Sequence, residues 1–158
     1  MKPEDSILLD DLDRRILAVL QEDASISNIE LAVLVHASAP TCLRRVKRLT
    51  ETGVIERQVV LVALHKVGPA LTAVVEITLD HQATEKLAEF ETLVANDAAV
   101  LQCYRVSPGP DFVLIVQVSD MPAYHALAHR LFATHANVRN VRSFFSIHRS
   151  KFETRIAV

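Results

Sequence analysis

The spacing of apolar residues changes part-way along this 158-residue chain. Over residues 9–55 apolar side chains recur every three or four positions, which is typical of amphipathic helices. Over residues 71–79 apolar and polar side chains alternate, which predicts a strand with one buried face. Gly68-Pro69 interrupts the pattern between these regions. We therefore expect two small domains, residues 1–62 and 70–158, joined by a linker over about 63–69.

Three short helices are expected in the first domain. Asp10 and Asp11 suit the N-terminus of a helix over about 11–22, because carboxylates accept hydrogen bonds from unpaired N–H groups there. Ser27 and Glu30 have the spacing of a capping box, which predicts a second helix over about 28–35.

The third helix is expected over about 39–52. Ser38 is a good N-cap and Pro40 falls in the first turn, where a missing N–H has no cost. Gly53 is placed to end this helix in the left-handed conformation. His36 lies in the short connection between the second and third helices, where the chain turns.

The third helix has one cationic face. Cys42, Val46 and Leu49 share the apolar side, whereas the opposite side contains Thr41 and a group of basic residues, namely Arg44, Arg45, Lys47 and Arg48. The whole chain has a formal net charge of −2, but this charge is unevenly distributed. Residues 1–30 contain three basic and eight acidic residues, whereas residues 31–57 contain five basic and two acidic residues. A solvated helix face is the alternative explanation for a lone basic cluster.

A short helix, a tight turn and a cationic third helix are typical of a helix-turn-helix, whose third helix enters the major groove of DNA. The β-branched run Val54–Val62 predicts strands, which would form a wing. We expect Arg44 and Thr41 to reach base edges, and Arg45, Lys47 and Arg48 to hold phosphates.

The second domain alternates strands with helices. Strands are expected over 71–79, 100–106, 112–118 and 138–147, with a further strand over Phe152–Val158. Helices are expected over 83–95 and after Asp120. The order β-α-β-β-α-β predicts an α+β, ferredoxin-like sandwich with two helices on one face of an antiparallel sheet. The other face has apolar positions, which predicts a second copy of the chain as its cover in a two-fold dimer; these positions are Val74, Val113 and Ile115.

Several other functions find no support in the sequence. The charged N-terminus is atypical of a secretory signal, and the longest apolar runs are too short to span a bilayer. Two cysteines make no disulfide framework, so a soluble protein of the reducing cytoplasm is expected. His125 and His129 share a helical face without a third ligand, so no metal site is expected. No nucleophile motif and no Gly-rich phosphate loop is present, so we expect neither an enzyme nor a cofactor.

Several longer motifs resemble one family of regulators. They are Leu12-Asp13-Arg14-Arg15-Ile16-Leu17, Ile26-Ser27-Asn28-Ile29-Glu30-Leu31-Ala32, and Cys42-Leu43-Arg44-Arg45-Val46-Lys47-Arg48-Leu49 followed by Gly53-Val54-Ile55. Over about residues 9–155 the chain resembles the Lrp/AsnC (leucine-responsive, feast/famine) transcriptional regulators. The resemblance implies a winged helix-turn-helix followed by an effector-sensing domain. It also implies three kinds of binding partner: double-stranded DNA, an amino acid or related small molecule, and further copies of the chain in dimers or octamers.

The resemblance also implies site residues. The positions matching the family's recognition helix are Ser38, Thr41, Arg44, Arg45, Lys47 and Arg48. The positions matching its effector site, near the loop between the second and third strands, are Ser107, Pro108, Gly109, Asp111 and Ser143. Two departures from the family pattern stand out. His36 replaces the usual glycine at the helix-turn-helix corner, and Pro108-Gly109-Pro110-Asp111 keeps only the final Asp of the usual effector loop.

Two other functions remain open from the sequence. Some proteins of similar architecture are decarboxylases acting on haem precursors such as sirohaem, and these are expected to lack the basic recognition helix. A ligand-binding module without a DNA role is the other alternative, and an absence of salt-dependent DNA binding would favour it.

Overall fold

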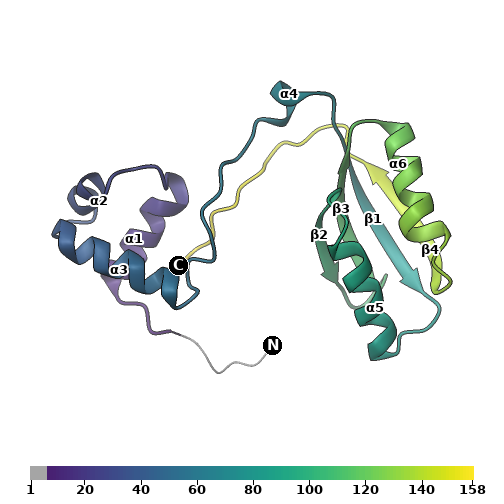
Figure 1. The fold of residues 1–158 in the computed structure, drawn as a ribbon, viewed down its shortest axis with the longest axis horizontal. Coiled ribbons are helices and arrows are strands. Elements are labelled where there is room, and N and C mark those ends of the chain that lie inside the picture. The colour runs from purple at the N-terminus through teal and green to yellow at the C-terminus, as the bar shows by residue number, and fades with distance from the viewer. Residues whose placement is uncertain (1–6) are drawn as a thin grey trace. The chain divides into compact units, whose positions relative to one another are not determined.

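A computed structural model of the chain describes residues 7–158, apart from the side chain of His65 (Figure 1). The chain forms two compact units. The first comprises the residues up to Leu61 together with Lys151–Val158, and the second comprises Val62–Ser150. Each unit has its own cluster of buried apolar residues.

The first unit contains the three expected helices, namely α1 (Asp11–Glu22), α2 (Asn28–Leu34) and α3 (Ala39–Glu51). Each begins at the cap that the sequence predicts. The Asp10 carboxylate accepts from the Asp13 N–H at 2.9 Å, the Ser27 hydroxyl from the Glu30 N–H at 3.2 Å, and the Ser38 hydroxyl from the Thr41 N–H at 3.3 Å. Asp10 and Ser27 both form complete capping boxes, which confirms the local signals.

The turn between α2 and α3 places His36 in the left-handed region of backbone conformation. His36 has a φ of 53°, a conformation that His adopts more readily than most residues other than glycine. The Ala37 N–H donates to the Ala32 carbonyl at 2.9 Å, and the Asn28 side-chain amide donates to the Ala39 carbonyl at 2.7 Å. Gly53 ends α3 with a φ of 74°, as predicted.

The core of the first unit is small and lies between the three helices. Cys42 is fully buried, in agreement with its expected place on the inner face of α3. The fully or almost fully buried residues of this core are Ile16, Leu17, Leu31, Ala32, Val35, Cys42 and Leu49.

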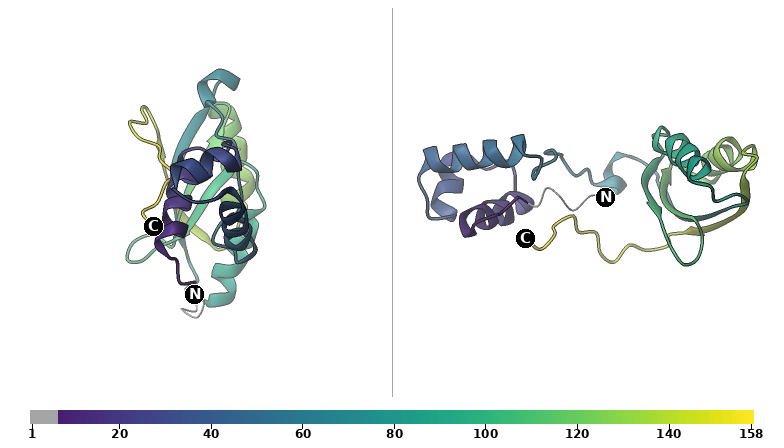
Figure 2. Two further views of the ribbon diagram at one scale, coloured as in Figure 1. Left: turned by 90° about the vertical axis from the view of Figure 1, so that its left-hand side faces the viewer. Right: turned by 90° about the horizontal axis from the view of Figure 1, so that it is seen from below.

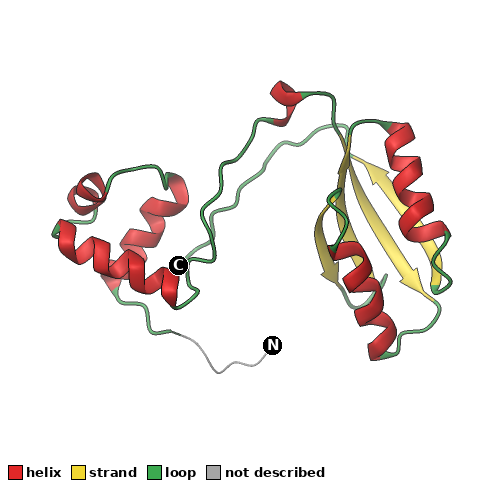
Figure 3. Ribbon diagram, viewed as in Figure 1, coloured by secondary structure: helices red, strands yellow, loops and turns green. Residues whose placement is uncertain are grey.

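Two segments that were expected to form strands, Val54–Val62 and Phe152–Val158, do not form them. Residues 56–63 have no regular secondary structure, and Val59–Val62 are 61–87% exposed (Figure 3). Phe152–Val158 likewise form no strand; this tail belongs to the first unit, not to the sheet of the second. Both predictions of strand were wrong because β-branched composition favours an extended backbone, whereas a strand also needs a neighbouring strand to bond with.

The second unit is a four-stranded antiparallel sheet with strand order β2-β3-β1-β4. Its strands are β1 (Leu71–Leu79), β2 (Val100–Arg105), β3 (Phe112–Val118) and β4 (Val138–Phe145). Its helices are the short α4 (Leu64–Val67), α5 (Thr84–Ala95) and α6 (Met121–Ala128), and a π-helical turn, His129–Ala133, continues α6.

α5 and α6 lie on the same face of the sheet (Figure 2), as the ferredoxin-like order predicts. Residues 73, 75, 77 and 79 of β1 are buried against these helices, together with Phe90 of α5 and Leu127 of α6. The alternate residues face the other side of the sheet, where Val74 of β1 is paired with Ile115 of β3. This face has no helix of its own unit over it. No helix within residues 7–158 has both the length and the apolar composition needed to cross a bilayer.

Candidate nucleic-acid interface and effector loop

The N-terminal part of the exposed side of α3 contains the hydroxyls of Ser38 and Thr41 and the guanidinium of Arg44. The Ser38 and Thr41 hydroxyls are 2.8 Å apart and hydrogen-bonded, so Ser38 acts as the N-cap and also orients Thr41. Arg44 follows one turn later and is exposed. Among the described residues nothing forms a hydrogen bond or an ion pair with its guanidinium, so this group is available to an external acceptor.

Lys47 is also directed into solvent. Its side chain is 73% exposed, and its ammonium lies 3.7 Å from the Glu51 carboxylate, one turn further along α3. An exposed pair of this kind contributes little to stability, so Lys47 can exchange Glu51 for another anion.

Arg45 and Arg48 have different surroundings, because both guanidiniums contact carboxylates at the start of α1. Arg45 Nη1 lies 2.6 Å from Asp10 Oδ2 and 3.2 Å from Asp13 Oδ1. Arg48 Nη2 donates to Asp13 Oδ2. The Asp13 side chain is fully buried, whereas those of Arg45 and Arg48 are 24% and 41% exposed.

The pKa values of Asp10 and Arg45 reflect these contacts. The pKa of Asp10 is lowered, first by the hydrogen bond from the Asp13 backbone N–H and then by that from Arg45. The pKa of Arg45 is raised, chiefly by its hydrogen bond to Asp10. Asp13, which the sequence does not single out as a site residue, is thus the buried anion beneath two of the six predicted DNA-contact residues. Its only sequence signal is its place in the motif that begins at Leu12.

The predicted effector loop lies between β2 and β3. Ser107-Pro108 is a cis peptide bond and Gly109 has a φ of 130°. Asp111 fixes the loop to β1, since its Oδ2 accepts from the Leu79 N–H at 2.7 Å and its own N–H donates to the Ile77 carbonyl at 2.8 Å. Ser107, Pro108 and Gly109 are exposed, whereas Asp111 is half-buried.

Ser143 is not brought to this loop. It lies on β4 opposite Val75 of β1, and β1 separates β4 from β3. Two strand spacings, roughly 10 Å, therefore divide Ser143 from β3, the strand that follows Asp111. The Ser143 hydroxyl is hydrogen-bonded to the Tyr124 hydroxyl from α6. Ser143 therefore faces the helix-covered side of the sheet.

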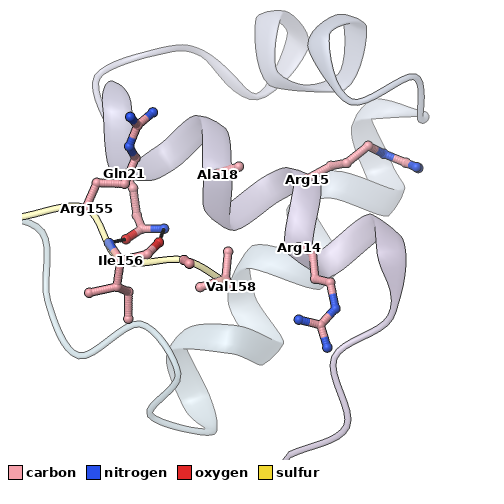
Figure 4. A pocket seen from close by; sticks show the side chains of 8 residues that line it. Arg14, Arg15, Ala18, Gln21, Arg155, Ile156 and Val158 are labelled. Carbon is pink, nitrogen blue, oxygen red and sulfur yellow. Dashed lines mark hydrogen bonds between the residues drawn. The ribbon is translucent and has the colours of Figure 1, made fainter.

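The C-terminal tail contacts α1. The Gln21 side-chain amide donates to the Ile156 carbonyl at 3.1 Å, and its oxygen accepts from the Ile156 N–H at 2.8 Å (Figure 4). Arg155 forms an ion pair with Glu22. A shallow cavity of ≈ 420 Å³ lies between the tail and α1, and Arg14 and Arg15 line it. The sequence gives no local signal for this contact, because 135 residues separate its partners.

The described residues contain no cluster of three or more His, Cys, Asp or Glu side chains that could hold a metal ion. Instead, His135 packs edge-on against Phe90, with ring centroids 5.6 Å apart.

Comparison with known proteins identifies the family. Residues 9–56 match the winged helix-turn-helix DNA-binding model, and residues 72–156 match the Lrp/AsnC ligand-binding domain. The chain belongs to the Lrp/AsnC family of transcriptional regulators. It is 34% identical over 150 residues to the leucine-responsive regulatory protein of Escherichia coli strain K12, covering 95% of this chain and 92% of that protein.

Solved structures of Lrp/AsnC regulators have the same fold over almost the whole chain. An AsnC family regulator from Agrobacterium tumefaciens is 36% identical with a TM-score of 0.87, over 94% of this chain and 96% of that one. A regulator from Neisseria meningitidis, solved as a complex with L-Met, is 28% identical with a TM-score of 0.87 over the same shares. The fold and the family predicted from the sequence are thereby confirmed.

Proposed function

We propose that this Lrp/AsnC regulator reads DNA with the N-terminal half of α3, and that an amino acid or a related small molecule controls its assembly. The observation that supports the first part is the free guanidinium of Arg44, which is exposed beside the hydroxyl of Thr41 on the first two turns of α3. These are the turns that a recognition helix presents to base edges.

Each side chain has a distinct role in this proposal. Arg44 donates two hydrogen bonds to a guanine or a phosphate, and Thr41 bonds a base or a phosphate. Lys47 is a phosphate contact, since only the exposed Glu51 competes for it. Ser38 holds the N-terminus of α3 and orients Thr41.

The face of the sheet that no helix of its unit covers supports a two-fold dimer. Val74 and Ile115 form an apolar cross-strand pair there, and Phe144 of β4 is 47% exposed. A second copy placed on this face would bury these side chains. In such a dimer two copies of α3 enter successive major grooves roughly 34 Å apart and read a pseudo-palindrome. Octamers built from these dimers are the larger assembly that the family suggests.

The loop over Ser107–Asp111 supports the effector site. One Asp111 oxygen is used by the Leu79 N–H, whereas the other has no hydrogen bond within the described part of the chain and is available to a ligand ammonium. The two prolines remove backbone donors from the loop. L-Met in the complex with the Neisseria regulator supports an amino acid as the effector class. Ser143 is left out of this proposed site, because it lies on the helix-covered side of the sheet and is hydrogen-bonded to Tyr124.

The effector shifts assembly only if it binds one assembly state more tightly than another. No catalytic step or cofactor is part of the proposal, and the protein acts in the cytoplasm, where its DNA is.

The decisive test of the DNA interface is Arg44→Ala, measured by fluorescence anisotropy on a duplex selected from random sequences with the intact protein. We expect specific affinity to fall by about 1–3 kcal/mol, or roughly 5- to 150-fold. Arg139→Ala is the matched control, because it removes an exposed arginine from β4 instead. Equal binding by wild type and Arg44→Ala would refute this interface.

The effector is sought in a thermal-shift screen of the twenty amino acids, followed by light scattering of each hit. We expect at least one amino acid both to raise the melting temperature and to change the assembled mass. A screen in which no amino acid does either would overturn the proposed effector class.

A further inference from the structure

We propose that Asp13 is the positioning residue of the recognition helix, and that Arg45 and Arg48 hold α3 on α1 through it instead of binding DNA phosphates. This inference rests on the proposed role of α3 in reading DNA. It assigns the four basic residues of α3 to two groups: Arg44 and Lys47 face the DNA, and Arg45 and Arg48 fix the helix that presents them.

The carboxylate of Asp13 accepts hydrogen bonds from three residues. Asp13 is the third residue of α1, and its Oδ2 accepts from the Asp10 backbone N–H at 3.2 Å. The same carboxylate accepts from Arg45 Nη1, at 3.2 and 3.3 Å to its two oxygens, and from Arg48 Nη2. It is fully buried, so solvent cannot replace any of these donors. One carboxylate therefore joins the first turn of α1 to two successive turns of α3.

Part of each arginine side chain is buried in this contact, although the Arg48 side chain as a whole is 41% exposed. Arg48 Nε is buried and has no hydrogen-bond partner in the part of the chain that the structure describes, so the inner end of this guanidinium lies within the interface between the helices. Arg45 is only 24% exposed and is held by Asp10 in addition to Asp13. To reach a phosphate, either side chain would have to give up its ion pair with the buried carboxylate, which would then keep only one of its two guanidinium partners. Breaking such a buried contact is costly.

Arg44 and Lys47 differ from this pair in the same helix. Arg44 has no partner among the described residues, and Lys47 has only the exposed Glu51, at 3.7 Å. The two pairs alternate along α3, so a cationic stretch that is continuous in sequence is divided between two sides in the structure.

The salt dependence of DNA binding distinguishes the two roles. Each phosphate contact adds about 0.9 to the slope of log K against log salt concentration, whereas a positioning residue adds nothing to it. We would measure this slope by anisotropy for wild type, Lys47→Gln, Arg48→Gln, Asp13→Asn and the double variant Asp13→Asn/Arg48→Gln, on the selected duplex and on a scrambled one. Circular dichroism of each variant reports whether the helices are intact.

We expect Lys47→Gln to reduce the slope by about 0.9 per subunit on both duplexes. Arg48→Gln should leave the slope unchanged. It should lower affinity for the selected duplex about tenfold more than affinity for the scrambled duplex. A tenfold loss of selectivity is within the range expected when one bidentate base contact is lost. In the double variant an amide pair replaces the ion pair, so part of the selectivity returns although the charge of Arg48 is still missing. A structural defect alone would weaken binding to both duplexes equally.

A slope reduced by Arg48→Gln as much as by Lys47→Gln would overturn the inference, since Arg48 would then be a phosphate contact. This result does not depend on whether Asp13→Asn folds. If neither Lys47→Gln nor Arg44→Ala affected DNA binding, the proposed role of α3 would fail instead, and the two failures are therefore distinguishable.

Discussion

Truncation of one core leucine should strongly destabilise the DNA-binding unit and leave the stability of the second unit unchanged. Leu49 lies on the inner face of α3 and is fully buried among the apolar residues of the first unit. That cluster has no member in common with the cluster around Phe90 in the second unit. Leu49→Ala therefore removes packing from one core only.

The expected magnitude follows from the burial of Leu49. A fully buried Leu→Ala substitution costs about 2–5 kcal/mol, and small domains have a total stability of about 0.05–0.15 kcal/mol per residue. For a unit of roughly 70 residues this total is about 3.5–10 kcal/mol, so one substitution removes a large part of it. Because each 1 kcal/mol shifts the midpoint of a domain of this size by about 4–8 °C, a loss of about 3 kcal/mol lowers it by about 12–24 °C.

Calorimetry with far-UV circular dichroism would resolve the two transitions, and peptide-resolved hydrogen exchange would assign them. We expect faster exchange in α1, α2 and α3 of Leu49→Ala, with the exchange of β1 and β3 unchanged. Leu43→Ala is the matched control. It makes the same substitution on the same helix where the side chain is 62% exposed, and it should cost about 0.5 kcal/mol or less. An equal shift of both transitions in Leu49→Ala would refute the independence of the two cores.

Two further predictions concern contacts of α1. Gln21→Ala removes both hydrogen bonds to Ile156. Amide exchange over residues 151–158, measured by mass spectrometry, should therefore become roughly tenfold faster. Unchanged exchange would show that other contacts hold the tail. The pKa of Asp10 is lowered in the folded chain, so its ionised form stabilises the first unit at neutral pH, and this contribution is lost as the pH falls below the unfolded value near 3.8. Urea unfolding of that unit should therefore show Asp10→Asn to be less stable than wild type at pH 6 and closer to it at pH 3, and a constant difference would contradict this assignment.

Local signals predict most of the fold because they act within a few residues. The caps Asp10, Ser27 and Ser38 place the starts of the helices, and the strand alternation over Leu71–Leu79 places β1 to the residue. These features depend on hydrogen bonds to the third residue along, or on which face of a strand is buried. Both the capping hydrogen bonds and the buried face of a strand can be predicted from a few consecutive residues.

The two wrong strands show where local signals end. Val54–Val62 and Phe152–Val158 are both rich in residues that favour strands, yet neither has a strand beside it within the described chain. The tail bonds instead to the side chain of Gln21, far away in sequence. Propensity sets the preferred backbone angles, but pairing depends on what tertiary structure brings alongside.

The candidate DNA interface has the same limit. Helical periodicity places the Cβ atoms of Arg45 and Arg48 on the exposed arc of α3, but an arginine side chain is long enough to turn its guanidinium back to a neighbouring helix. The sequence counts Asp13 as one of eight acidic residues in a surface-charged segment, whereas the structure buries it completely. Only the packing of α1 on α3 shows that part of the negative charge of residues 1–30 neutralises part of the positive charge of residues 31–57.

This neutralisation has a consequence for how the regulator responds to its effector. On the proposed division of α3, Arg45 and Arg48 are paired with α1, which leaves Arg44 and Lys47 of its four basic residues for DNA. So few cationic contacts per subunit give a single helix-turn-helix only weak, salt-dependent affinity. Two such units joined in a dimer double the number of contacts, and the second unit binds at a high effective concentration. Affinity for DNA then depends steeply on the assembly state, so an effector that changes assembly can control DNA binding without contacting α3.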